Sequence, residues 1–239
     1  MPYRRLPNTD QARIRTLRMA VDNCIQKGIY TNTLKHNTYA RAKNVLEKFS
    51  RAVDAYKRCV TEQSSKRGND KYEAAYKKAR MYVMHFLQVF SMAVMRGEIP
   101  RAKRAYYGLS VEDDSVPTII LESAVLEWSK RIAEGERKRQ AEGGIPIYNP
   151  TMGRVAVACD LFKEMYERQQ QLGQNTAEAL LAVATMRAEC DGIILEVWQE
   201  IEEKFASLDA AEKIKKCSEY GIIYYTRRDR EKKTLNPNE

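Results

Sequence analysis

The stretch DKYEAAYKKARMYVMHFLQVFSMAVMRG, from Asp70 to Gly97, decides the fold class. Its apolar residues recur every three or four positions, which is the period of a helix that buries one face. They are Tyr72, Tyr76, Ala79, Val83, Phe86, Phe90 and Ala93. Asp70 and Glu73 have the spacing of a capping box, and Gly97 is typical of a helix end. The stretch therefore predicts one long helix with a buried face.

The same spacing of apolar residues runs through the rest of the chain, which has only 11 Gly and 7 Pro in 239 residues. Helices are predicted to begin near Asp10, Thr38, Asp70, Pro117, Thr151, Asn175 and Asp209. Gly28 is the expected end of the first, and Gly143-Gly144 that of the helix after Pro117. Only Ile222 to Tyr225 alternates like a strand, and four residues cannot form a sheet alone. We predict an all-α protein of six or seven helices in a helical bundle-like body.

The two halves of the chain resemble each other at an offset of 113 residues. The matches pair Thr38 with Thr151, Arg41 with Arg154, Phe49 with Phe162, and Tyr107-Gly108-Leu109 with Tyr220-Gly221-Ile222. We predict two similar three-helix units, although two unrelated helical sequences could also match this well by chance. The expected boundaries are a basic unit over 1–109, an acidic linker over 110–116, an acidic unit over 117–226 and a polar, disordered tail over 227–239.

Positive charge is concentrated in the first half, although the whole chain carries +9. Residues 1–110 contain 23 Lys and Arg against 8 Asp and Glu, whereas residues 111–226 contain 13 against 21. Such an imbalance suggests an anionic partner for the first half, or electrostatic docking between halves or between subunits. Two solvated helical surfaces of drifting composition would explain it equally well.

The N-terminal residues contain no apolar segment of the kind that a secretory signal needs. The most apolar long stretch, from Met81 to Met95, is shorter than the ~20 residues that span a bilayer. The five cysteines are widely separated, unlike a disulfide framework. We therefore expect a cytoplasmic protein with reduced thiols and no membrane partner.

Four segments taken together carry a resemblance. They are residues 3–10, 81–109, 126–151 and 217–228, and the second ends in RGEIPRAKRAYYGL. They resemble a family of uncharacterised all-helical proteins predicted from bacterial genomes. The resemblance implies an all-helical, cytoplasmic protein, and it brings no activity, cofactor or site residue.

Signals for catalysis and for metal binding are weak. Glu112-Asp113-Asp114 offers oxygen ligands, but it lacks the spaced ligands and the glycine of a calcium loop. Arg80 and His85 fit the Arg-x4–6-His spacing of small helical ribonucleases of the HEPN class, a match that 22 arginines and two histidines produce readily by chance. We expect no metal, no cofactor and no enzyme, with metal-independent RNA cleavage by Arg80 and His85 as a remote alternative.

Clustered cations beside tyrosines favour nucleic-acid binding by the basic half, because bases stack on aromatic rings. The candidates are Arg4, Arg5, Lys77, Lys78, Arg80, Arg101, Lys103, Arg104, Tyr106 and Tyr107. No DNA- or RNA-binding signature accompanies them. The leading hypothesis is therefore a non-catalytic interaction or scaffold protein that binds another protein or a second copy of itself. Binding of DNA or RNA is the alternative.

Overall fold

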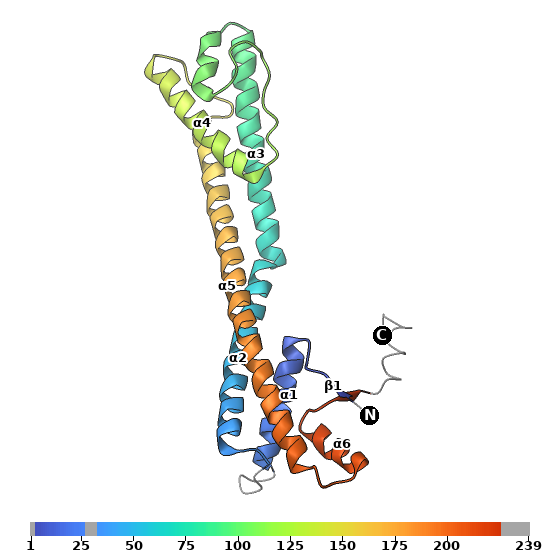
Figure 1. Ribbon diagram of the computed structural model, residues 1–239. Coiled ribbons are helices and arrows are strands. Elements are labelled where there is room, and N and C mark those ends of the chain that lie inside the picture. The colour runs from blue at the N-terminus through green and yellow to red at the C-terminus, as the bar shows by residue number, and fades with distance from the viewer. Residues whose placement is uncertain (1–2, 27–32, 226–239) are drawn as a thin grey trace. The chain divides into compact units, whose positions relative to one another are not determined.

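The computed structural model describes residues 3–26 and 33–225, and helices dominate this part of the chain (Figure 1). The helices are α1 (Asp10–Gln26), α2 (His36–Gln63), α3 (Lys66–Met95), the 3₁₀ helix η2 (Arg101–Tyr107), α4 (Glu122–Ala141), α5 (Met152–Lys204) and α6 (Ala210–Glu219). Strand β1 (Tyr3–Arg4) pairs antiparallel with β2 (Tyr224–Tyr225). The all-α prediction is confirmed. The expected helix end at Gly28 and the expected tail over 227–239 lie outside the described residues.

Three helix starts predicted from the sequence are wrong. Helix α3 begins at Lys66 rather than at Asp70, and Ser65 before it has non-helical backbone, with φ of −58° and ψ of 117°. Helix α4 begins at Glu122 rather than near Pro117, because Leu121 before it is extended. Asn175 starts no helix, because α5 runs without a break through Gly173 and Asn175. A single glycine in a helix interior costs only about 1 kcal/mol, and no proline interrupts this segment. The polar residues around Asn175 therefore do not end helix α5.

The described chain divides into two compact units, and these differ from the expected halves. Unit 1 consists of Met1–Val60 and Asn175–Glu239, and unit 2 consists of Thr61–Gln174. Each unit therefore combines segments from both halves of the sequence. The expected boundaries at 109 and 117 both fall inside unit 2.

In unit 1, α1, α2, the last part of α5 and α6 share one apolar core. Leu17, Phe49, Ile194, Trp198 and Cys217 are all at most 1% exposed there. These residues come from four helices, so burial of their apolar surface ties all four together.

In unit 2, α3, η2, α4 and the first part of α5 form a second core. Phe86, Phe90, Tyr107, Ile132 and Phe162 are fully buried in it. The rings of Phe90 and Tyr107 lie 4.1 Å apart between centroids, which fixes η2 against α3.

Tight turns closed by a glycine follow helices in both units, and two of them are at Gly108 in unit 2 and at Gly221 in unit 1. The two glycines have φ of 70° and 85°, which side chains other than glycine adopt only with strain. Each donates its N–H to the carbonyl three residues earlier, at 3.1 and 3.0 Å, and the following residue donates to the carbonyl five earlier, at 3.1 and 3.4 Å. The two turns therefore share one hydrogen-bond pattern, that of a helix end closed by glycine.

Gly221→Ala is expected to lower the free energy of unfolding by about 2–4 kcal/mol, since it combines backbone strain with overpacking. An added Cβ would lie 3.0 Å from the Thr16 carbonyl oxygen. Gly143→Ala is the matched control: its φ is +82°, but nothing lies within 4 Å of the added atom, so about 1–2 kcal/mol is expected. Urea unfolding followed by circular dichroism measures both. Equal losses would show that α1 does not restrict this turn.

Candidate functional site

The basic N-terminal segment pairs with acidic residues of α5 inside unit 1. Arg13 binds Asp191 through two hydrogen bonds of 2.7 and 2.9 Å. Arg187 binds Asp10 in the same way, at 2.9 and 2.8 Å, and the hydrogen bond from Arg187 lowers the pKa of Asp10 despite partial burial. Arg41 adds a pair with Glu196 at 2.7 Å. Of the explanations for the uneven charge, docking between halves of one chain is therefore present in the structure.

The two units divide the net charge more evenly than the two halves of the sequence do. Unit 1 contains 23 Lys and Arg against 17 Asp and Glu, a net charge of +6. Unit 2 contains 18 against 15, a net charge of +3. The strong sequence asymmetry therefore does not produce one basic and one acidic unit.

Two residues expected to contact nucleic acid are instead buried. Arg104 is 0% exposed and donates to the carbonyls of Ser110 and Ser115 and to Ser91 Oγ. Tyr107 is also 0% exposed, and its hydroxyl donates to Glu136 at 2.6 Å. Their expected role at a binding surface is wrong, because both side chains stabilise the interior of unit 2.

Six of the remaining candidates have partners within the chain. The pairs are Arg4 with Glu202, Lys77 with Glu73, Arg80 with the Ile119 carbonyl, Arg101 with Asp114, Lys103 with Glu142, and Tyr106 with Glu142. Arg5 and Lys78 make no such contact among the described residues. The ten candidates therefore do not form one basic surface.

Arg80 and His85 do not form a catalytic pair in the described structure. Both lie on the continuous helix α3, where five residues correspond to a rotation of about 140°. Arg80 Nε donates to the Ile119 carbonyl at 2.6 Å. The guanidinium therefore holds the segment before α4 rather than facing the imidazole.

The linker expected over 110–116 is part of unit 2. Arg101 donates to the carbonyls of Val111 and Glu112 and pairs with Asp114 at 3.2 Å. Asp113 accepts two hydrogen bonds from Ser115, which lower its pKa. The carboxylates of Asp113 and Asp114 thus have partners within the chain. The described residues contain no group of three or more His, Cys, Asp or Glu placed to hold a metal ion.

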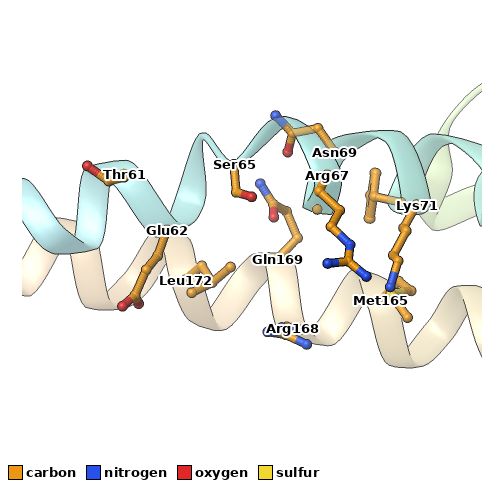
Figure 2. A pocket seen from close by; sticks show the side chains of 12 residues that line it. Thr61, Glu62, Ser65, Arg67, Asn69, Lys71, Met165, Arg168, Gln169 and Leu172 are labelled. Atoms are coloured by element: carbon orange, nitrogen blue, oxygen red, sulfur yellow. The ribbon is translucent and has the colours of Figure 1, made fainter.

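A basic pocket of about 500 Å³ lies in unit 2, where α3 begins beside α5 (Figure 2). It is lined by Thr61, Glu62, Ser65, Arg67, Gly68, Asn69, Lys71, Tyr72, Met165, Arg168, Gln169 and Leu172. Figure 2 shows Arg67 and Lys71 extending from α3 toward α5, which carries Arg168 and Met165. Within residues 3–26 and 33–225, these three cations have no hydrogen bond or ion pair. Three unpaired cations thus surround one hollow.

A second feature is an exposed apolar face on α5, within unit 1. It consists of Ala177, Leu180, Leu181, Ala184 and Ala188, spaced three or four apart so that they share one side of the helix. Leu180 is 40% exposed and Leu181 64%. The opposite side of this segment is buried through Val183 and Cys190. This part of α5 therefore has two apolar faces, and residues 3–26 and 33–225 cover only one of them.

Two carboxylates flank the apolar face. Glu178 and Glu189 are exposed, and neither forms an ion pair among the described residues. Their separation of 11 residues is three helical turns, so both lie on the same edge of the face. The face therefore presents apolar surface beside negative charge.

The apolar face and the basic pocket were not found from the sequence. The signal for the face was present: alanines and leucines at helical spacing from Ala177 to Ala188, in addition to the stripe through Val183. The pocket had no comparable signal, since Lys71 and Arg168 are 97 positions apart.

Comparison with known proteins yields no relative: no family model, no curated protein and no solved structure matches this chain. The resemblance to a bacterial all-helical family therefore remains a prediction. In the described part of the chain, no helix combines the length and the apolarity that crossing a bilayer requires.

Proposed function

We propose that this protein is a non-catalytic interaction protein that binds an amphipathic helix of another protein on the apolar face of α5. The observation that carries the proposal is the exposure of Leu181, at 64%, within an apolar stripe that no described part of the chain covers. Exposed apolar stripes at helical spacing are the surfaces on which partner helices dock.

An internal repeat, which we also propose, provides a comparison for this face. At an offset of 113, Ala42, Val45 and Phe49 of α2 correspond to Val155, Ala158 and Phe162 of α5, and all six are buried. At an offset of 111, buried residues of α3 match buried residues of α5: Ala79 with Cys190, Val83 with Ile194, Phe86 with Val197, Leu87 with Trp198, and Phe90 with Ile201.

The corresponding face of α3 is polar. Offset by 111, Leu181 and Ala184 correspond to Asp70 and Glu73, and Ala188 corresponds to Lys77. Glu73 and Lys77 form an exposed ion pair at 2.7 Å, as expected for a solvated helix surface. A helix in this position of the repeat therefore does not need apolar residues on this side in order to fold. Their presence on α5 supports a binding role for them.

The negative charge beside the apolar face favours a different protein over a second copy of this chain as the bound partner. A symmetric antiparallel pair of α5 faces would place the same edge of each face together. Glu178 would then approach Glu189 of the copy, and like charges repel. A partner helix with basic residues beside its apolar stripe would instead complement this edge. The expected partner is therefore a helix with basic residues beside its apolar stripe.

Leu181→Glu is expected to weaken partner binding about 30-fold or more, because it removes an apolar contact and adds a charge. A photo-crosslinking amino acid at position 181 in the native cell identifies the bound protein. The affinity of that purified partner for wild type and variant is then measured by calorimetry. Val157→Glu is the matched control, since Val157 is 72% exposed on the same helix but outside the face.

Light scattering of the purified chain separates the two kinds of partner. A monomer that binds the cross-linked protein through a basic-flanked helix supports the proposal. A dimer that Leu181→Glu dissociates would show that a second copy covers the face. A crosslinking yield at 181 no higher than that at 157 would show that the face binds nothing.

A further inference from the structure

We propose that the basic pocket binds a small ligand that carries two or three linked phosphate groups. This site is separate from the apolar face of α5 and does not depend on it. The proposal rests on Arg67, Lys71 and Arg168, three cations without partners in the described chain that line one hollow.

The three cations line one hollow, whereas other cations without partners among the described residues, such as Lys78 and Arg154, lie outside it. Further cations, such as Arg13, Lys77 and Lys103, pair with carboxylates. Glu62 is the only carboxylate among the residues lining the pocket, and Figure 2 shows it at the opposite end from Lys71. The end that contains Arg67 and Lys71 therefore has uncompensated positive charge, which an anion would balance.

The donor set favours phosphate. Guanidinium groups bind phosphate oxygens through paired hydrogen bonds, and lysine adds a point charge. Two helices supply the cations, and Asn69 and Gln169 add amide donors to the same lining. Because the donors lie on both α3 and α5, several linked phosphate groups can contact more of them than a single phosphate group can.

The rest of the lining suits the organic part of such a ligand. Tyr72, Met165 and Leu172 supply apolar surface next to the cations. The ring of Tyr72 is held in place against Phe162, at 5.8 Å between centroids. A volume of about 500 Å³ is within the usual range for small-molecule pockets. A nucleoside triphosphate therefore fits the chemistry of the whole pocket.

Calorimetry with the full chain tests the proposal, using inorganic triphosphate, ATP and a short single-stranded RNA as probes. We expect triphosphate and ATP to bind, with ATP tighter because of the apolar lining. The double variant Lys71→Glu with Arg168→Glu is expected to weaken both about tenfold or more. The altered side chains are exposed and without partners, so the fold is expected to persist, which circular dichroism checks.

Lys78→Glu with Arg154→Glu is the matched control. It changes the net charge by the same amount at exposed, unpaired cations outside the pocket, and binding should stay within about twofold of wild type. Equal weakening by both double variants would overturn the site, because net charge alone would then explain binding. Absence of triphosphate and ATP binding at millimolar concentration would overturn it as well. Binding of RNA alone would show an extended nucleic acid in place of a small ligand.

Discussion

Replacing Glu136 with alanine is expected to lower the free energy of unfolding by about 3–5 kcal/mol, because it leaves a buried arginine unpaired. Glu136 and Arg139 are 1% and 4% exposed. Their two hydrogen bonds are 2.7 and 3.0 Å long, and the Tyr107 hydroxyl and Gln140 donate to the same carboxylate at 2.6 and 2.8 Å. The Ile147 N–H also donates to it at 3.3 Å, so the variant would remove the acceptor of five hydrogen bonds at once.

Urea unfolding measures the loss, and Glu134→Ala on the same helix is the control. Glu134 is exposed and without an ion pair in the described residues, so a change within about 0.5 kcal/mol is expected. A loss of less than about 1 kcal/mol for Glu136→Ala would contradict the prediction, since it would mean that water reaches Arg139.

The same network predicts a dependence of stability on pH. Burial alone would raise the pKa of Glu136, but hydrogen bonds from Arg139, Tyr107 and Gln140 outweigh it and hold the pKa below its usual value. The stability supplied by the carboxylate is therefore present above the ordinary pKa of a glutamate and is lost as the pH falls through the lowered pKa. Glu136→Gln should show a shallower loss in acid than wild type. Parallel acid titrations would contradict this role.

Arg104→Met is expected to cost about 3 kcal/mol or more, because it leaves the buried Ser91 hydroxyl and two partly buried carbonyls without this donor. The guanidinium donates to the Ser110 and Ser115 carbonyls at 2.5 and 2.8 Å and to Ser91 Oγ at 3.0 Å. These bonds hold the segment after η2 against α3. Hydrogen exchange over residues 110–115 should therefore increase in the variant.

Arg101→Met is the matched control for Arg104→Met. Arg101 lies in the same 3₁₀ helix and contacts the same segment, but its side chain is 46% exposed, so water can replace the lost partners. A cost of about 1 kcal/mol or less is expected. Equal costs at the two positions would show that burial does not distinguish them.

Helix ends were well predicted wherever a local contact decides them. Thr9 accepts from the Ala12 N–H at 3.2 Å at the start of α1, and Asp209 accepts from Glu212 at 2.8 Å at the start of α6, as their capping positions suggested. Gly97 and Gly143 have φ of 77° and 82° at the predicted helix ends. Each of these signals acts within a few residues, so it can be read without knowledge of the fold.

The sequence by itself determined the helical class, the caps at Thr9, Asp209, Gly97 and Gly143 and most buried stripes, because these depend on spacing along one helix. Only the tertiary structure decided that Arg13 meets Asp191, that Arg104 is buried, and that Leu181 is left exposed. Contacts between residues far apart in the chain depend on which helices pack together. Helical periodicity shows that a face is apolar, but it does not show whether another helix covers that face.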